Sequence, residues 1–545
     1  MNIQKLERGS VLLCALLTIL VISLVGANVL VNSTTRYNVT SKQVKGWKEA
    51  LIAAEAGGDT GYAECRKTIG DPNVSTIFTN DGWAVPSPAP ANLTWTKSVP
   101  AFGQDATLSA TVTVDVLPAN NINPPSTNNY YRIRATGTAK VMGLRRTGMD
   151  DRMSLTTRGD SLLRKIDFSY DHFKATYGDG DGNSPQVSPV PYPQISRRIE
   201  LIATPVDPFE GALKCVSSFS GPGPASVIDS YDSHNTPPPG ASPVPANSNY
   251  YFAANNPNDP HYADSRNGNV AVNAPNFADL QSAPIYGNVG TNGGNVTHSA
   301  YPAIYGTIDN SISFTVPPIT QPTGITYQAG SPNTITPSAT AKSAATPDWY
   351  LYSGDLPNNF GINALSYTDP VTHVTKPVET YVNVVVTGNI GGNGNPSVTI
   401  ANGVTAKIYF AGNYSVKASN TNNNNVDGAP GVLMVDPNNA ANYVQSDNTS
   451  RASHMQFYGI NPPAGQTQTI DTNPGGGASN AKLWAVFYAP GADFTMNGNP
   501  DLFGAVVCRT FYGNGNTGFH YDKALKWLSG PPVDYRIASY VEDIR

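Results

Sequence analysis

Residues 11–31 read VLLCALLTILVISLVGANVLV, an unbroken run of 21 uncharged and mostly apolar residues near the N-terminus. At about 1.5 Å per residue, a helix of this length spans roughly 30 Å, the thickness of the hydrocarbon core of a bilayer. Basic residues precede the run, and no acidic residue interrupts it. The sequence therefore predicts a cytoplasmic leader at 1–9 and a transmembrane helix at 10–31, with Val11 and Val31 bounding the apolar anchor.

Basic flanks tend to stay in the cytoplasm, so we expect the N-terminus inside and the bulk of the chain in the periplasm or outside the cell. A secretory signal peptide is the alternative interpretation. Its apolar core usually has about 7–15 residues and is followed closely by a small-residue cleavage site. This run is longer and lacks such a site, so a single-pass anchor fits better.

The composition favours strands and turns over helices. Only 13% of the 545 residues are charged, while 50 are Gly and 45 are Pro, a mixture that suits short strands joined by many turns. The net charge of −5 gives no electrostatic support to a nucleic-acid partner. Cys14 lies in the apolar run, and the other cysteines, Cys65, Cys215 and Cys508, allow one disulfide and one free thiol but no disulfide framework.

A stalk helix over residues 32–70 is expected to continue the apolar run. Four of its residues recur at spacings of three and four, which places them on one helical face: Val44, Trp47, Leu51 and Ala54. This face predicts packing against the globular part of the protein or against neighbouring subunits. Three glycines then weaken the helix, which we expect to fray or end near residue 68: Gly57, Gly58 and Gly61.

Strands follow the stalk helix. Residues 106–116, ATLSATVTVDV, alternate between apolar and polar side chains, which predicts a half-buried strand of an antiparallel sheet. Residues 130–140 and 198–203 are predicted to be two further strands. We therefore expect one small β-rich or α+β domain over residues 71–205.

A repeat of 19 residues lies beyond residue 206. The tripeptides Gly-Asn-Val at 268–270, Gly-Asn-Val at 287–289 and Gly-Thr-Ile at 306–308 are evenly spaced. A unit with one short apolar strand cannot bury its own apolar face, so such units stack on one another. We predict a parallel β-helix-like solenoid over 206–525, in which Gly and Asn supply left-handed corners and Asn side chains hydrogen-bond between rungs.

The expected fold is thus mainly β: an N-terminal transmembrane and stalk α-helix, a small β-rich domain and the solenoid. A Pro/Thr/Ser-rich stretch at about 317–378 is interpreted as an insertion in the solenoid, and residues 526–545 as a polar C-terminal tail. The alternative to the solenoid is an antiparallel sandwich with Asn-Gly hairpins. The regular 19-residue interval disfavours it.

The N-terminal region resembles that of PilX-type proteins, minor components associated with type IV pili. The resembling residues are Glu7-Arg8-Gly9-Ser10 before the apolar run and Ala53-Ala54-Glu55-Ala56-Gly57 after it. The resemblance covers about residues 7–66 and implies that a prepilin peptidase cleaves between Gly9 and Ser10. In major pilins, the fifth residue after the cleavage site is a Glu that pairs with the amino terminus of a neighbouring subunit. Here that residue is Cys14, which argues against ordinary incorporation into a filament shaft.

Segments of the solenoid region resemble an uncharacterised exported domain of PilX-like envelope proteins. They stand at 211–213 (GAL), 227–233 (VIDSYDS), 487–490 (FYAP), 497–499 (NGN), 503–505 (FGA) and 519–522 (FHYD). This likeness covers about 206–525 with gaps. It implies an architecture and a location rather than an activity.

Two motifs suggest catalysis or metal binding, and both are incomplete. Residues 159–162, GDSL, spell the nucleophile motif of an esterase superfamily, but no downstream Asp-x-x-His completes it. Asp179, Asp181 and Asn183 match the start of a calcium loop, but the Gly and the acid that the loop needs further on are missing. Neither motif predicts a site.

Other polar groups have simpler explanations. His520 and Asp522 lie two residues apart, and a buried, hydrogen-bonded His at the last rung fits better than a metal ligand. Asp493, Asp501 and Arg509 form the densest charged group on the rungs, which is sparse for an enzyme that acts on polysaccharides.

We therefore expect a membrane-anchored, pilin-like structural or assembly protein of the bacterial cell envelope, related to type IV pili and without catalytic, cofactor or metal sites. The alternative is an anchored adhesin or glycan-binding protein, with Tyr286 and Tyr305 as sugar-stacking candidates, although stacking between rungs is the simpler interpretation. A polysaccharide-acting enzyme is the third hypothesis. The expected partners are the membrane, pilin-like or envelope subunits and, under the alternative, surface glycans, but no nucleic acid.

Overall fold

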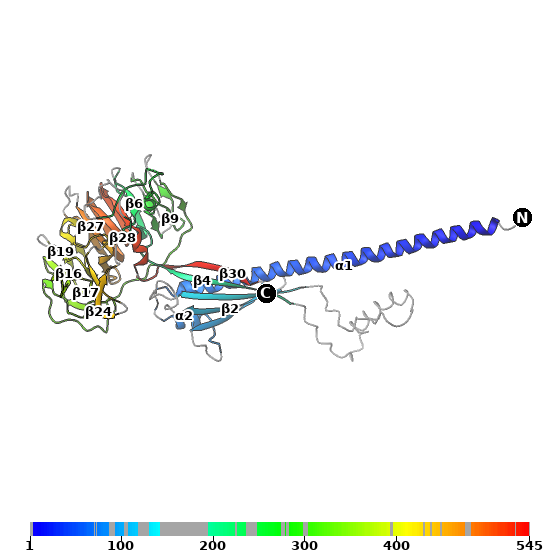
Figure 1. The fold of residues 1–545 in the computed structure, drawn as a ribbon, viewed down its shortest axis with the longest axis horizontal. Helices are drawn as coiled ribbons and strands as arrows, with labels where there is room; N and C mark the ends of the chain where they lie inside the picture. The colour runs from blue at the N-terminus through cyan, green and yellow to red at the C-terminus, as the bar shows by residue number, and fades with distance from the viewer. Residues whose placement is uncertain are drawn as a thin grey trace.

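The computed structural model describes residues 4–69, 71, 73–86, 93–102, 107–117, 130–141, 194–223, 226–235, 248–273, 278–279, 283–297, 304–392, 396–428, 431–436, 439–446, 450–474, 481–528 and 530–543. The protein is mainly β, as the sequence predicts, and combines a long N-terminal helix with antiparallel and parallel sheets. The helix projects from one end of the body, and stacked strands form the other end (Figure 1).

The first sheet, called the stalk sheet below, is antiparallel and has the strand order β1-β2-β3-β4-β30. Its elements are β1 (Thr94–Phe102), β2 (Leu108–Leu117), β3 (Tyr130–Lys140), β4 (Gln194–Val206) and β30 (Asp534–Asp543). Helix α1 (Gln4–Lys67) packs its C-terminal part on this sheet, and the short helix α2 (Val74–Asn80) follows it. Strands β2, β3 and β4 correspond to the three predicted ones, whereas β1 and β30 were not expected.

Small residues bring α1 into close contact with the stalk sheet. A Cβ on Gly137 of β3 would lie 2.1 Å from the carbonyl oxygen of Ala50 and 2.2 Å from the amide nitrogen of Ala54. A Cβ on Gly61 of α1 would lie 2.7 Å from the side chain of Ile133. The glycines expected to weaken α1 therefore serve close packing, and tertiary contacts outweigh their low helix propensity.

The remaining strands form the region called the stack below. They are β5 (Leu213–Ser220), β6 (Ile228–Tyr231), β7 (Val270–Val272), β8 (Ala278–Asp279), β9 (Val289–Thr291), β10 (Val296–Thr297), β11 (Ile308–Asp309), β12 (Thr334–Ile335), β13 (Asp348–Tyr352), β14 (Phe360–Ile362), β15 (Leu365–Thr368), β16 (Thr375–Val378), β17 (Thr380–Val386), β18 (Ile390–Gly391), β19 (Val398–Ile400), β20 (Val404–Phe410), β21 (Tyr414–Ser415), β22 (Thr421–Asn423), β23 (Leu433–Asp436), β24 (Asn439–Gln445), β25 (Met455–Gly459), β26 (Gln468–Asp471), β27 (Lys482–Gly498), β28 (Asp501–Gly515) and β29 (Phe519–Asp522). Short 3₁₀ helices stand at Asp264–Arg266, Ala418–Asn420, Ala452–His454 and Lys523–Trp527.

Parallel pairing runs through the stack in an order that differs from the order along the chain. One row reads β13, β17, β20, β25, β27, β28, β5, β7, β9 and β11, each strand parallel to its neighbours. The first strand, β5, therefore lies in the middle of the row, between β28 and β7. The chain builds outward from β5 to β11, crosses to the opposite end and returns to β28 beside its starting point. Parallel rows of this kind disagree with the alternative of an antiparallel sandwich.

The 19-residue repeat corresponds to successive rungs of this row. Val289 is the direct partner of both Val270 and Ile308. The backbone N–H of Asn288 donates to Oδ1 of Asn269 at 2.8 Å, and the N–H of Thr307 donates to Oδ1 of Asn288 at 2.9 Å. Asn side chains therefore link the rungs, as predicted, by accepting from the backbone of the next rung.

The repeat glycines have a different role from the predicted one. Gly268, Gly287 and Gly306 do not adopt positive φ. Instead, a Cβ on Gly287 would lie 2.5 Å from the carbonyl carbon of Gly268, so only glycine lets the rungs approach this closely. Left-handed corners do occur at the Asn-Gly-Asn turns, where φ is +81° at Gly498 and +106° at Gly515.

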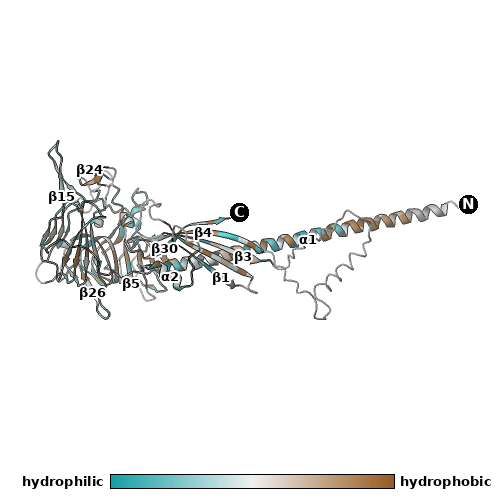
Figure 2. Ribbon diagram, turned by 90° about the horizontal axis from the view of Figure 1, so that it is seen from below, coloured by the Kyte–Doolittle hydropathy of each residue, from teal (hydrophilic) through white to brown (hydrophobic). Residues whose placement is uncertain are grey.

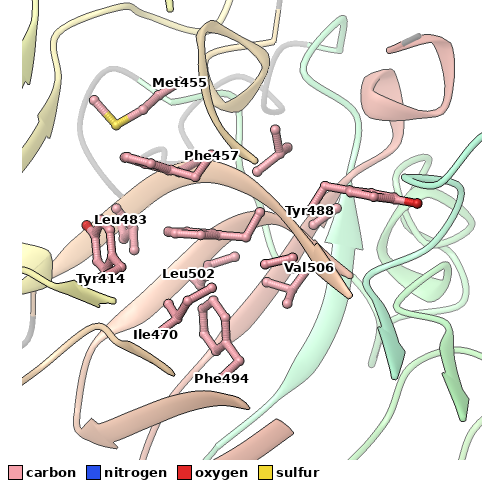
Figure 3. Packing of buried hydrophobic residues seen from close by; sticks show 14 of the residues in the cluster. Tyr414, Met455, Phe457, Ile470, Leu483, Tyr488, Phe494, Leu502 and Val506 are labelled. Carbon is pink, nitrogen blue, oxygen red and sulfur yellow. The ribbon is translucent and has the colours of Figure 1, made fainter. Parts of the chain in front are cut away.

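Aromatic side chains fill the interior of the stack on successive rungs (Figure 3). The rings of Phe457 and Phe487 stack with centroids 4.8 Å apart, and Tyr414 meets Phe487 edge-on at 5.5 Å. Phe494 stacks on Phe511 at 5.7 Å. Like residues at like positions thus form ladders that bury the apolar face of each rung against the next.

The predicted insertion at 317–378 includes residues that belong to the parallel sheets of the stack. Strand β13 belongs to the main row, and β12 and β14 pair parallel with β19 in a second sheet. The segment before them crosses the stack, where the hydroxyl of Tyr488 donates to the carbonyl of Pro317 at 2.8 Å and Ile319 bridges to Ile460.

The expected polar tail at 526–545 contains β30, which pairs antiparallel with β4 from Asp534 opposite Val206 to Asp543 opposite Arg198. The alternation is hard to see in its sequence, because this edge strand is mostly exposed. The stack is therefore inserted between two neighbouring strands of the stalk sheet, and β4 and β30 are seen side by side at the junction in Figure 1.

Candidate membrane and assembly interface

The first half of α1 has an apolar surface that nothing in the described structure covers. Its large side chains are more than half exposed, Leu13 at 63% and Leu30 at 70% for example. Its polar groups are satisfied inside the helix: the hydroxyl of Thr18 donates to the carbonyl of Cys14 at 2.8 Å, and Asn32 donates to the side chain of Asn28 at 3.0 Å. Figure 2 shows the apolar colour along this protruding part.

The length and composition of α1 are sufficient for it to cross a membrane. The mean hydropathy of its most apolar 18-residue stretch is 2.5, and none of that stretch is buried. Because every backbone N–H and C=O of a helix interior is bonded within the helix, such a segment is stable in a hydrocarbon environment.

The middle of α1 departs from the predicted packing face. Val44 and Trp47 are 42% and 51% exposed, while Leu51 is half-buried and Ala54 fully buried on the stalk sheet. The sheet-facing side is built instead from small residues such as Gly46 and Ala50, which the apolar periodicity did not reveal. Val44 and Trp47 are therefore free to contact other molecules just beyond the apolar run.

The predicted processing site lies in the first turns of α1. Gly9 and Ser10 are helical, and cleavage between them stays a prediction. Cys14 is exposed on the same helix.

The charged rung residues form structural contacts. Arg509 of β28 forms an ion pair with Asp493 of the neighbouring β27, and the hydroxyl of Thr510 donates to the same carboxylate at 2.6 Å. Asp501 accepts from the N–H of Gly518 at 3.0 Å. The group thus holds adjacent rungs together, with no pair of free carboxylates across a cleft.

His520 is buried and hydrogen-bonded, as predicted, and its partner is Asp229. Nδ1 of His520 lies 2.6 Å from Oδ1 of Asp229, and Oδ2 of the same carboxylate accepts from the hydroxyl of Tyr250 at 2.7 Å. The imidazole ring contacts Tyr250 and Phe503, each with centroids 4.5 Å away. Asp229 lies 291 residues before His520, so spacing could not reveal the pair.

Two buried carboxyl groups lie close to one another behind this cluster. Burial, together with the charge of Asp522, raises the pKa of Asp427 to about 7. Burial likewise raises the pKa of Asp522. Asp427 accepts from the hydroxyl of Ser248 at 2.8 Å and from the N–H of Arg451 at 2.9 Å, and these bonds join loops that are distant in sequence.

The two candidate sugar-stacking tyrosines belong to a group called the aromatic patch below: Phe252, Tyr262, Arg266, Tyr286 and Tyr305. Phe252 and Tyr305 are exposed, whereas Tyr286 is buried beneath them. The rings of Tyr286 and Tyr305 stack at 4.4 Å with planes 6° apart, so stacking between rungs is confirmed. Tyr305 is nonetheless 42% exposed, and the guanidinium of Arg266 lies 5.3 Å from its ring centroid. The repeat revealed the tyrosines, but nothing in the sequence pointed to Arg266 or Tyr262.

Residues 159–162 and Asp179, Asp181 and Asn183 lie outside the described residues. Within the described ranges, no group of three or more His, Cys, Asp or Glu side chains is placed to hold a metal ion.

The comparisons with known proteins find a family model that matches part of the chain and a distant solved structure. The family described as "Domain of unknown function (DUF7305)" matches residues 377–528, which run from the end of β16 past β29 and so cover much of the half of the stack that closes on β5. No curated protein matches the chain. A solved structure, the competence-associated pilin ComZ from Thermus thermophilus, matches over 91% of this chain and 97% of that chain, at 11% identity and a TM-score of 0.24. A score this low carries no argument about this protein.

Proposed function

We propose that the protein is a membrane-anchored, pilin-like structural or assembly protein of the bacterial cell envelope, related to type IV pili. The observation that carries the proposal is α1: one continuous helix of 64 residues with a bare apolar first half and a second half built into the stalk sheet. One continuous helix therefore joins the anchor to the stalk sheet. In this proposal the N-terminus is cytoplasmic and the stack has no catalytic role.

The exposed residues beyond the apolar run favour protein partners in addition to lipid. Val44 and Trp47 are exposed where α1 begins to pack on the stalk sheet through Gly46, and their side chains meet water unless another protein covers them. A neighbouring helix packed along α1 would cover both the run and these two residues. Cys14 supplies no charge for an amino terminus, so we propose a place outside the repeating shaft of a filament.

The N-terminal residue of the mature protein tests this proposal. We expect Ser10 as the first residue in protein taken both from membranes and from a sheared surface fraction. The variant Gly9→Leu should keep Met1 and disappear from the sheared fraction. Gly361→Ala in the stack, whose methyl group would make an ordinary contact of 3.5 Å with Thr334, should behave like the parent. An intact Met1 in the unmodified protein, confined to the membrane, would contradict pilin-like processing.

Glycan binding is the second candidate function, and the aromatic patch favours it. Exposed aromatic rings stack on the apolar faces of sugar rings, and an adjacent Arg donates hydrogen bonds to hydroxyl or carboxylate groups. A glycan array probed with the full chain in detergent tests it. Binding that disappears in Tyr305→Ala and Arg266→Ala, but survives in Tyr512→Ala, would support this role. Tyr512 is an equally exposed tyrosine on β28 and lies outside the patch.

A further inference from the structure

Two cysteines meet where the first strand of the stack pairs with one of its last. Cys215 of β5 and Cys508 of β28 are direct partners in the parallel pairing, and their Sγ atoms lie 3.7 Å apart. Both side chains are fully buried. Neighbouring strands lie about 4.8 Å apart, which is within the Cα separation that a disulfide spans, so the bond requires only a small rotation of the two side chains.

The pair sits at the joint between the two halves of the stack, called the seam below: the pairings β28–β5 and β29–β6. One half is built from β5 to β11 and the other from β13 to β29. The two cysteines are 293 residues apart, so the seam is the most non-local contact of the row. They also form the last regular pair before the register shifts ahead of Thr510. A covalent bond here would hold β5 and β28 together next to the irregularity in their pairing.

We propose that Cys215 and Cys508 form a disulfide that cross-links the seam. The proposal rests on the export of the stack under the proposed function, because structural disulfides persist in oxidising compartments outside the cytoplasm. Cys65 is buried in the core of the stalk, and Cys14 is on the apolar run, so both stay as thiols. The chain thus carries its own unpaired controls.

The bond forms by thiol–disulfide exchange with an oxidant that carries a disulfide. The thiolate of one cysteine attacks the oxidant and releases one of its thiols, and the second thiolate then attacks the mixed disulfide and releases the other. The two cysteines lose two protons and two electrons, and the oxidant gains them as two thiols. Burial raises the pKa of the Cys508 thiol well above its usual range, so exchange is fastest before the seam closes during folding.

The test is the redox state of each cysteine in the full chain isolated from membranes. Free thiols are blocked with N-ethylmaleimide under denaturing conditions, and peptides are then identified by mass spectrometry. We expect the Cys215 and Cys508 peptides to be linked and the Cys65 peptide to be alkylated. Location is measured separately, by the access of added protease to the stack in spheroplasts.

The outcomes separate this proposal from the proposed function. An exported stack with both stack cysteines alkylated would overturn the disulfide and leave the function standing. A stack retained in the cytoplasm would contradict the function instead. In that case refolding of the purified chain in a glutathione redox buffer decides the pairing: a linked pair supports the disulfide, and free thiols overturn it.

Thermal unfolding gives an independent readout. Reductant should lower the Tm of the parent and of Cys65→Ser by about 5 °C, because a cross-link over so long a loop restricts the unfolded chain. The double variant Cys215→Ser, Cys508→Ser should start from the lower Tm and show no response to reductant. Equal responses of the parent and the double variant would overturn the proposal.

Discussion

The stalk sheet and the stack both depend on glycine for close contact, but they use it against different neighbours. In the stalk, Gly137 of β3 faces the backbone of α1, and glycines of α1 such as Gly61 face side chains of the sheet, all within one helix–sheet interface. In the stack, Gly287 faces the backbone of the rung beneath it, and Gly306 repeats the contact one rung further on. Substituting such a glycine should therefore destabilise the whole stalk, but in the stack it should destabilise only the adjacent rungs, because stacked units contact mainly their neighbours.

The largest expected effect comes from Gly137→Ala. The new methyl group would lie about 2 Å from backbone atoms of α1, which can move only with the whole helix, so we expect a loss of about 3 kcal/mol or more in the free energy of unfolding. Amide hydrogen exchange should rise along β3 and the second half of α1. Gly26→Ala is the matched control and should leave both regions unchanged. Unchanged protection in Gly137→Ala would contradict the tight helix–sheet contact.

Gly287→Ala should cost less, about 2 kcal/mol, because the added methyl group displaces one rung rather than a whole helix. Hydrogen exchange should increase in β7, β9 and β11 and stay constant in β25 and β27. The control is Gly361→Ala, whose methyl group would make an ordinary contact of 3.5 Å with Thr334. A uniform increase across the stack would show that the rungs unfold as one unit.

A third effect is expected from pH. Burial raises the pKa of Asp427 to about 7 in the folded stack against 3.8 for the free side chain, so the folded state holds a proton that the unfolded state has released. Stability from this group is fully present below pH 4 and is lost as pH rises through about 7. Tm measured from pH 4 to pH 8 should show this decline.

The same series on Asp427→Asn isolates the source of the decline. The variant cannot ionise at this position, so its profile should be flatter than that of the parent. Asp232→Asn, at a partly exposed carboxyl, serves as the control and should keep the parental slope. A parental slope in Asp427→Asn would assign the decline to another group.

The smallest effect is expected where stalk and stack meet. Arg66 of α1 forms an ion pair with Asp534 at 2.7 Å and donates to the carbonyl of Ser313 at 2.7 Å. Its side chain is one-third exposed, so Arg66→Ala should lower the free energy of unfolding by less than about 1 kcal/mol. Arg536→Ala, which removes a more exposed pair with Glu210, should cost still less. Denaturant titration of both variants checks this order.

Patterns over short stretches of sequence predicted those parts of the fold whose burial or pairing follows the same short spacing. The apolar run indicated the first half of α1, and alternation indicated β2 because one of its faces is buried and the other is not. The 19-residue spacing indicated the rungs from β7 to β11 because their partners are one repeat away. The glycines of α1 were predicted to weaken the helix because glycine has a low helix propensity. In the structure they let the helix pack closely on the stalk sheet.

Long-range pairings could not be predicted. Strand β30 pairs with β4 although the whole stack separates them in the sequence. Asp229 contacts His520 only because β6 pairs with β29. The order of the row, with β5 in its middle, leaves no trace in the spacing of residues. Of the aromatic patch, only the two repeated tyrosines carried a signal, because Tyr262 and Arg266 lie just before and in a short 3₁₀ helix outside the repeat.

The junction of β4 and β30 has a mechanical consequence. The stack is joined to the stalk sheet by two neighbouring strands, with Val206 and Asp534 paired at the point of entry. A pulling force on the stack is therefore shared by two strands, β4 and β30, which enter the stalk sheet from the same end and run along it (Figure 1). The hydrogen bonds to β3 lie across this direction and resist in shear together, so a load on the head would reach the anchor helix without unzipping the sheet bond by bond.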